Sequence, residues 1–223
     1  MILDNEHKLA FIHIPHCAGS NIRNRLLDNN RFTKYIPDTL PNEYKIELED
    51  LFVTSNHFLV MSNATISIDH LSAHYTPTKY KSVVFIKNTF HREVSQYFMF
   101  SQYQKVFEKY FFTDFKSFLN FKYFTDPDTP FIQMNTGILR NRGCYEYCYE
   151  KDNLIADYLF KIEDVSTFWT DFSSRFNLPL DLWDTKFNVQ TQGNWRDYYD
   201  QECIDIVAKF RKKDLDAFGY TFA

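Results

Sequence analysis

Short apolar runs alternate with amphipathic segments along this chain. The runs at 9–14, 82–86 and 158–162 are rich in aromatic and β-branched residues, as is typical of buried parallel strands. Each run is followed by a segment in which apolar residues recur every three or four positions, which indicates a helix. Strands that alternate with helices predict an α/β fold whose central, mainly parallel sheet is flanked by helices.

The same helical spacing fixes the bounds that we expect for the longer helices, which are 90–110, 111–124, 165–176 and 200–218. Gly219 follows the last of these, where a C-terminal cap belongs. The region 31–80 gives weaker signals, and there we predict only a strand at 58–61 and a turn or short helix at 71–75. Because no repeat or linker divides the chain, we expect a single domain over residues 1–223.

The composition limits the classes of protein to which this chain can belong. The 223 residues carry a net charge of −4 and are 44% hydrophobic, so a soluble domain can bury roughly 70% of its unfolded surface without a disulfide or metal. The charge balance gives no sign of a nucleic-acid or anionic-membrane surface. No apolar run reaches the roughly 18 residues needed to span a bilayer. The segment Met1–Lys8 is too polar for a secretory signal.

The four cysteines are irregularly spaced, and they are Cys17, Cys144, Cys148 and Cys203. Their spacing, without nearby histidines, does not fit a zinc site, so we predict no metal and expect free, mostly buried thiols. Together with the absence of a secretory signal, this pattern favours the reducing cytoplasm.

Glycine is scarce, and its first occurrence is informative. The chain has 24 Phe, 15 Tyr and 3 Trp but only 5 Gly, and Gly19 is the only glycine in the first 136 residues. It lies in the turn between the first strand and a helix, beside Ser20 and Asn21. Amide groups at a helix N-terminus suit a phosphate, although a plain capped helix would use the same residues. A Walker A loop is excluded because the GxxxxGK[ST] pattern is missing.

The second buried strand ends in a similar turn, FIKNTFHREVSQY. Lys87 leaves the end of this strand, and Arg92 and Ser95 lie on the following helix. Because ligands of α/β folds bind beyond the carboxyl ends of the strands, Lys87 and Ser95 are candidates to hold a second phosphate. Alternatively, Arg92 forms a structural ion pair and Ser95 faces solvent.

Four segments, in order, carry a resemblance to a known family. FIHIPHCAGSNIRNRLL resembles the first phosphosulfate-binding segment of Golgi-type and bacterial carbohydrate sulfotransferases, commonly FIHIPKxGGTS or PKCAGTS. FIKNTFHREVSQYF resembles their second segment, FxRNPxxRxxSxY. YLFKIEDVSTFWTDFSSRFNL and NWRDYYDQECIDIVAKFRKKDLDAFGYTF resemble their third and C-terminal elements. The likeness spans residues 9–222 and is poorest over 31–80.

The resemblance implies a three-layer, P-loop NTPase-like fold and an activity. Members of this family move a sulfuryl group from 3′-phosphoadenosine-5′-phosphosulfate (PAPS) to a hydroxyl, usually of a carbohydrate, and release adenosine 3′,5′-bisphosphate. The resemblance also implies that Lys87 and Ser95 hold the 3′-phosphate and that no metal takes part. The 5′-phosphosulfate would be held by the first loop, whose residues are His16, Cys17, Ala18, Gly19, Ser20 and Asn21.

Two departures from the family pattern bear on activity. His16 stands where the family has its loop lysine, and Lys87 stands where it has an arginine. A histidine beside a polyanion favours its charged form, so His16 can still act as a donor. The alternative is a catalytically impaired nucleotide- or glycan-binding relative. A third reading is a small-molecule kinase with an atypical phosphate loop.

The acceptor hydroxyl needs a base near neutral pH, and histidine is the natural choice. His70 lies where the family often has a histidine ahead of its second segment, and His74 follows four residues later. A surface or structural role is the alternative for each. Glu163 matches a family glutamate, for which a positioning role and a catalytic role both stay open.

Overall fold

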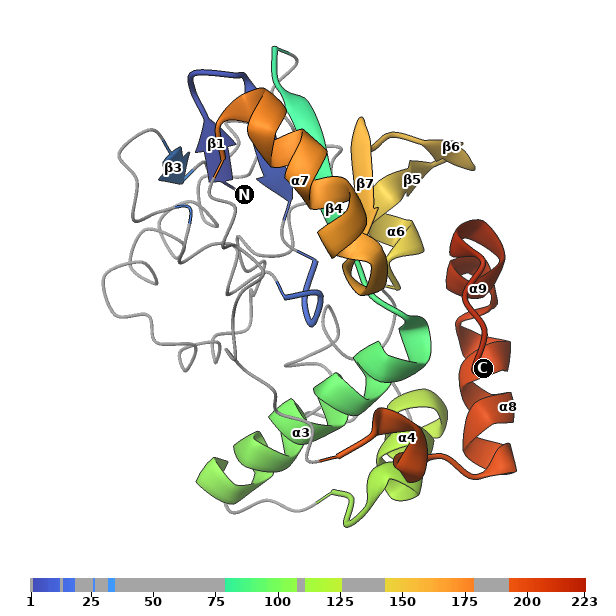
Figure 1. The fold of residues 1–223 in the computed structure, drawn as a ribbon. Coiled ribbons are helices and arrows are strands. Elements are labelled where there is room, and N and C mark those ends of the chain that lie inside the picture. The colour runs from blue at the N-terminus through green and yellow to red at the C-terminus, as the bar shows by residue number, and fades with distance from the viewer. Residues whose placement is uncertain are drawn as a thin grey trace.

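A five-stranded sheet with the strand order β3–β1–β2–β4–β7 forms the centre of the molecule (Figure 1). The structure is a computed structural model that describes residues 2–12, 14–18, 26, 32–34, 79–107, 111–125, 143–178 and 193–223. The strands of this sheet are β1 (Ile2–Asp4), β2 (Leu9–Ile12), β3 (Phe32–Lys34), β4 (Lys81–Ile86) and β7 (Tyr158–Lys161). A separate antiparallel pair consists of β5 (Tyr149–Glu150) and β6 (Asn153–Leu154).

The three predicted strands are confirmed as β2, β4 and β7, and they pair in parallel. The sheet is nevertheless mixed, because β1 pairs antiparallel with both β2 and β3. Because the segment Met1–Lys8 is polar, its sequence did not predict the strand β1. The buried carboxylate of Asp4 accepts hydrogen bonds from the amides of Glu6 and His7, so it closes the turn into β2 instead of facing solvent.

The helices largely follow the predicted bounds. They are α3 (Thr89–Phe107), α4 (Phe115–Phe124), α6 (Tyr145–Cys148), α7 (Val165–Phe176), α8 (Gln201–Phe210) and α9 (Lys212–Phe218), with 3-10 turns η3 (Ile162–Asp164) and η5 (Trp195–Tyr198). The helix α7 has the predicted bounds, whereas α4 begins later because Asp114 and Ser117 form a capping box. The predicted last helix is two helices, since Arg211 leaves helical geometry between α8 and α9. Gly219 caps α9 in a left-handed conformation, as predicted.

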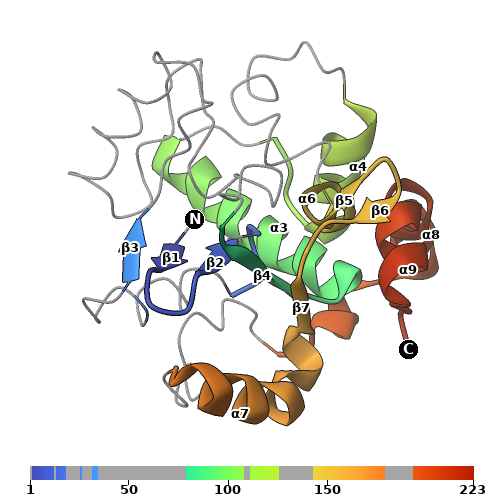
Figure 2. The same ribbon diagram turned by 90° about the horizontal axis from the view of Figure 1, so that it is seen from above.

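Helices cover both faces of the sheet (Figure 2). The even-numbered core residues of β2 and β4 pack with side chains of α6 and α9, such as Tyr147 and Phe218. Their odd-numbered residues pack on the other face with α7, through Trp169 and Phe172. This alternation follows from the two-residue period of a strand. The described part of the chain is therefore an α/β structure with a mixed sheet.

A third core lies where α3, α4 and α8 meet, at the carboxyl ends of the parallel strands (Figure 1). Its buried side chains are mainly phenylalanines, and the partly buried rings of Trp195, Tyr198 and Tyr199 pack against them. Packing against this core accounts for much of the aromatic content, including these three rings. No described helix is long and apolar enough to cross a membrane.

Some predictions fall outside the described residues. The strand at 58–61 and the short element at 71–75 are among them. Of the predicted helix after residue 21, only Leu26 is described, and it is helical and buried against the face of the sheet that α7 covers.

Candidate functional site

The two predicted turns meet at one edge of the sheet. Because β2 and β4 run parallel, with Ile12 opposite Val84, the loop at 14–18 and the turn at Lys87 both leave carboxyl ends of neighbouring strands. In α/β structures this edge is where loops can converge on a ligand. The two segments therefore share one neighbourhood although more than 60 residues separate them along the chain.

The first loop is a tight turn with an uncommon backbone. The Cys17 amide donates to the Ile14 carbonyl over 3.1 Å, which closes the turn. His16 and Ala18, on either side of Cys17, have φ angles of 67° and 58°, in the left-handed region. For residues with a Cβ this conformation costs about 1–2 kcal/mol each. Such strain is concentrated at functional sites, which favours a binding role for this loop over a plain connection.

Within this loop, the side chains of His16 and Cys17 differ in exposure. His16 is half-buried, whereas the Cys17 thiol is only 1% exposed and lies against Cys144. Cys17 therefore presents its backbone, and not its thiol, to anything bound at the loop. Gly19, Ser20 and Asn21, the predicted donors that follow, lie outside the described residues, as do His70 and His74.

The side chains of Lys87 and Ser95 contact each other. Lys87 Nζ donates to Ser95 Oγ over 3.1 Å, and Ser95 Oγ donates to the His91 carbonyl over 3.2 Å. Burial lowers the pKa of Lys87 to about 8, so it is still mainly charged at pH 7. Among the described residues Lys87 forms no ion pair. A cation and a hydroxyl that converge in this way suit an anionic ligand.

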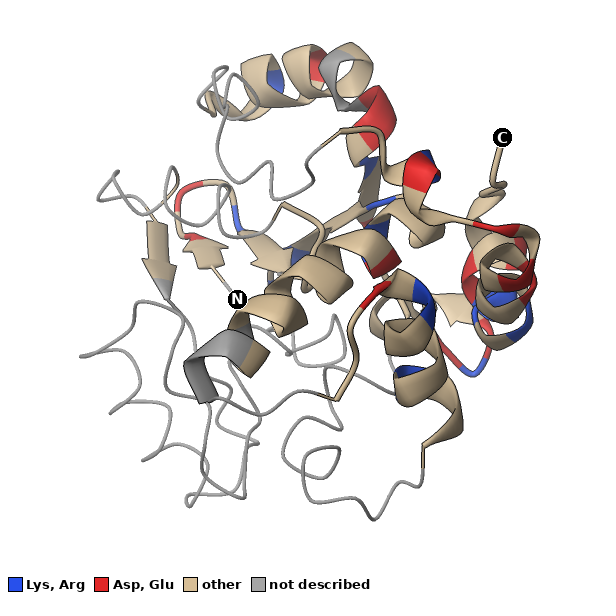
Figure 3. Cartoon of the chain, turned by 90° about the horizontal axis from the view of Figure 1, so that it is seen from below, with Lys and Arg blue, Asp and Glu red and all other residues tan. Residues whose placement is uncertain are grey.

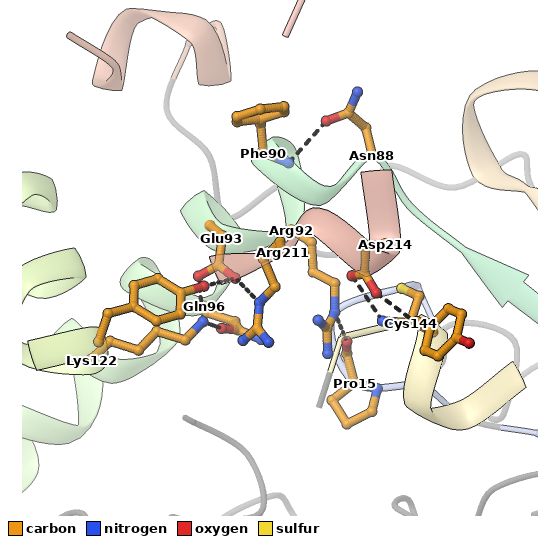
Figure 4. Close-up of polar contacts among 12 residues, drawn as sticks. Pro15, Asn88, Phe90, Arg92, Glu93, Gln96, Lys122, Cys144, Arg211 and Asp214 are labelled. Carbon is orange, nitrogen blue, oxygen red and sulfur yellow. Dashed lines mark hydrogen bonds and ion pairs between the residues drawn. The ribbon is translucent and has the colours of Figure 1, made fainter. Parts of the chain in front are cut away.

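Arg92 joins the two segments. Its Nε donates to the Pro15 carbonyl over 3.0 Å, and the side chain is 1% exposed (Figure 4). The bond attaches the first turns of α3 to the loop after β2. The sequence left a structural ion pair open for Arg92, and this stays a prediction beside the contact to the backbone of the candidate anion loop. An arginine within the second motif was the only signal for this link.

The amides at the start of α3 are already occupied. Asn88 Oδ1 accepts from the amides of Phe90 and His91, over 3.0 and 3.4 Å. The Asn88 side chain thus caps the helix. The anion-binding capacity of this turn therefore rests on the side chains of Lys87 and Ser95 and not on the helix N-terminus.

Glu163 connects the third and fourth family-like segments to this turn. Its carboxylate accepts from the Asn88 amide over 2.6 Å and from the Tyr220 hydroxyl over 3.1 Å. The Asn88 side chain also donates to the Thr221 carbonyl over 3.1 Å. These contacts make Glu163 a residue that positions the turn after β4 and the C-terminal tail.

His91 is half-buried and neutral. Its ring stacks on Trp195 at 5.7 Å, and the Arg196 guanidinium lies 4.2 Å from the centroid of the Trp195 ring. Burial, assisted by the positive charges of Lys87 and Arg196, lowers the pKa of His91 to about 3. His91 therefore adds no positive charge at neutral pH, and the charge beside Ser95 comes from Lys87.

Behind the loop, Gly143 and Asp214 form a support that the sequence did not reveal. The buried Asp214 carboxylate accepts from the amides of Cys144 and Tyr145, over 3.0 and 2.8 Å (Figure 4). A Cβ at position 143 would lie 2.2 Å from Asp214 Oδ1, so only glycine fits. Glycine is required at position 143 by this close approach, because the carboxylate occupies the space of a side chain.

Arg92 and Glu93 lie in the first two turns of α3, and Figure 3 shows this helix mostly in tan. Across the described ranges, no group of three or more His, Cys, Asp or Glu side chains is placed to hold a metal ion. The side chains of Lys87 and Ser95 offer a cationic and a hydroxyl group to an anion. No family model, no curated protein and no solved structure matches this chain.

Proposed function

We propose that this protein is a sulfotransferase that uses PAPS as sulfuryl donor. The observation that carries the proposal is the contact between Lys87 and Ser95 at the end of β4, tied by Arg92 to the loop after β2. This is the arrangement that the resemblance of the two motifs implies for the 3′- and 5′-phosphate groups of the nucleotide. The helices on both faces of the sheet support the P-loop-like, three-layer fold that the proposal includes.

In this proposal Lys87 and Ser95 bind the 3′-phosphate. The charge of Lys87 supplies most of the attraction, and an adjacent dianion raises the pKa of Lys87 above its value of about 8 in the free protein. The Ser95 hydroxyl turns its proton from the His91 carbonyl to the phosphate and adds a second hydrogen bond. The loop 16–21 surrounds the 5′-phosphosulfate with its backbone amides, and Arg92 attaches that loop to the first turns of α3.

Transfer requires a base for the acceptor and a donor for the leaving phosphate. His70 or His74 takes the proton of the acceptor hydroxyl, whose oxygen forms the new bond to sulfur as the bond from sulfur to the phosphate oxygen breaks. His16 donates a hydrogen bond to that phosphate oxygen, on which negative charge develops. The acceptor class that the resemblance favours is a carbohydrate. Four buried, free thiols support a reducing compartment, the cytoplasm, for this reaction.

The test is transfer of labelled sulfate from PAPS to a panel of carbohydrates, beside calorimetric titration with adenosine 3′,5′-bisphosphate. We expect binding in the micromolar range and transfer that is lost in the His16→Ala variant. Absence of heat and of any thermal shift at millimolar nucleotide would refute the proposal. ATP and magnesium serve as a control, because a kinase would prefer them to PAPS.

One observation favours a second candidate, a binding protein that transfers nothing. His16 stands in place of the lysine of the family, on a backbone held in the left-handed region. A His16→Lys variant separates the two candidates. If the natural protein binds the nucleotide and only His16→Lys transfers sulfate, the natural protein is the binder; if the natural protein transfers sulfate, it is the enzyme.

A further inference from the structure

Two cysteines that are 127 residues apart in the chain meet beneath the candidate anion loop. Cys17 Sγ lies 3.7 Å from Cys144 Sγ. The two thiols are 1% and 0% exposed, and both belong to the core under α6. Cys148 shares that core, but the sulfur–sulfur contact in the described residues is the one between Cys17 and Cys144. This pair connects a strained loop to the start of a helix.

The surroundings of the two thiols give them different chemistry. Although burial opposes it, a hydrogen bond from the Cys144 thiol and the positive charges of Arg92 and Lys87 lower the pKa of Cys17. The Cys144 pKa is raised, because its proton is shared with Cys17 and because it is buried. Since the thiolate is the nucleophile, Cys17 is the sulfur that reacts first.

We propose that Cys17 and Cys144 are a disulfide-forming pair that responds to a peroxide. In the first step the Cys17 sulfur attacks one oxygen of hydrogen peroxide, the O–O bond breaks, and a sulfenic acid and one water form. In the second step Cys144 attacks the Cys17 sulfur, the S–O bond breaks, and a second water leaves as the S–S bond forms. The two thiols lose two protons and two electrons in total, and the peroxide takes up both.

The bond would move the loop. A disulfide needs the sulfur atoms about 2.05 Å apart, so the pair must close from its present 3.7 Å. Both cysteines donate an amide hydrogen bond, Cys144 to the buried Asp214 carboxylate and Cys17 to the Ile14 carbonyl within its own turn. The partner of Cys17 belongs to the loop, and His16 and Ala18 on either side of it are in the left-handed conformation, so we expect the loop to be the side that moves. Oxidation therefore pulls the loop backbone toward Cys144 and changes its position relative to Lys87 and Ser95.

Peptide mapping of the full chain after treatment with hydrogen peroxide tests the pair directly. We expect two of the four thiols to be lost and a single linked peptide pair that contains Cys17 and Cys144. Cys148→Ser and Cys203→Ser are the matched controls, and each should form the same bond. A peroxide-treated chain without this linked pair, or one that links Cys17 to Cys148 instead, would overturn the proposal.

The effect on the site is a second readout, and it rests on the proposed function. We expect peroxide to weaken binding of adenosine 3′,5′-bisphosphate at least tenfold, dithiothreitol to restore it, and Cys144→Ser to bind equally before and after peroxide. If the treated Cys144→Ser variant loses binding as the natural chain does, the assignment of this effect to the pair is wrong. If the reduced natural chain binds no nucleotide, the proposed function fails, and the peptide map alone decides on the disulfide. Since that map uses the natural chain, it decides even if Cys17→Ser or Cys144→Ser does not fold.

Discussion

Two polar clusters adjoin the helix α3, and they differ in whether the cations are paired with a carboxylate. On one side, the Glu93 carboxylate accepts hydrogen bonds from Lys122, Arg211 and Tyr123, and we refer to these four residues as the ion cluster. On the other side, Lys87 and Ser95 form what we refer to as the anion site. The ion cluster supplies a carboxylate for its cations, whereas Lys87 has no carboxylate in ion-pair contact within the described part of the chain.

The pairing within the ion cluster affects the pKa values of its members. Against the effect of burial, the charges of Lys122 and Arg211 lower the pKa of Glu93 to about 2, so the carboxylate stays ionised. Burial likewise lowers the pKa of Lys122 to about 7, in spite of Glu93. Fully buried charges persist only when paired, and here the pairing is internal. The ion cluster pairs its cations with a carboxylate of the protein itself, although Arg211 Nη2 is buried without a hydrogen-bond partner among the described residues, whereas the cation of the anion site is left to pair with a ligand.

The largest effect is expected when the ion cluster is opened. Glu93→Gln leaves Lys122 and Arg211 buried without their counter-charge, and we expect a loss of about 3–5 kcal/mol in the free energy of unfolding. Denaturant titration measures it. Glu202→Gln is the control, because it removes a carboxylate from an exposed ion pair with Lys116 and should leave stability unchanged. Equal stability of the two variants would show that the ion cluster does not hold α3, α4 and α8 together.

The next effect separates binding from folding. Lys87→Ala removes the cation of the anion site, and we expect adenosine 3′,5′-bisphosphate to bind about a hundredfold more weakly. Stability should not fall, because the buried charge of Lys87 has no ionic partner among the described residues. Lys116→Ala, on the outer side of α4, is the matched control and should bind as the natural chain does. Calorimetry and denaturant titration on the same samples decide whether the two properties separate.

The pH dependence of nucleotide affinity also tests whether Lys87 supplies the charge of the anion site. Burial lowers the pKa of Lys87 to about 8, and a bound phosphate favours its charged form. Affinity should therefore fall by about twofold between pH 7 and 8 and by up to about tenfold per pH unit above pH 8. A Lys87→Arg variant should bind without this decline, because arginine stays charged. An affinity that is equal at pH 7 and pH 9.5 in the natural chain would exclude Lys87 from the site.

The smallest effect concerns the hydroxyl. Ser95→Ala removes one hydrogen bond to the nucleotide, and we expect a loss of about fivefold in affinity. Ser101 is the matched control, because its hydroxyl donates to the Tyr97 carbonyl four residues back, as that of Ser95 donates to His91. Ser101→Ala should change nothing in a titration. Equal effects of the two variants would mean that Ser95 acts only on the helix.

The comparison also shows what the sequence reveals. Lys87 and Ser95 could be predicted because both belong to a local pattern. Lys87 follows the end of a strand, and Ser95 lies in the second turn of the next helix, where its side chain contacts Lys87. The ion cluster could not be predicted, because Glu93 comes from α3, Lys122 from α4 and Arg211 from the break between α8 and α9, and only packing brings them together. The same holds for Gly143 and Asp214, and for Cys17 and Cys144.

The strands also differ in whether the sequence predicts them. The apolar runs of β2 and β4 are buried on both faces and that of β7 is partly buried, so their sequence predicts them. The short strand β1 could not be predicted, because its Asp4 is buried by hydrogen bonds to a turn and resembles a solvent-facing residue in the sequence. Of the predicted site residues, the structure describes His16, Cys17, Ala18, Lys87 and Ser95. The described part of α3 connects Lys87 and Ser95 to the loop that contains the other three.

The most direct test of the anion site is a calorimetric comparison of two nucleotides on the natural chain, adenosine 3′,5′-bisphosphate and adenosine 5′-monophosphate. They differ only in the 3′-phosphate, for which Lys87 and Ser95 are the proposed partners. We predict at least tenfold tighter binding of the bisphosphate, and loss of this preference in Lys87→Ala. Equal affinity of the two nucleotides for the natural chain, or a preference that survives in Lys87→Ala, would contradict the central claim.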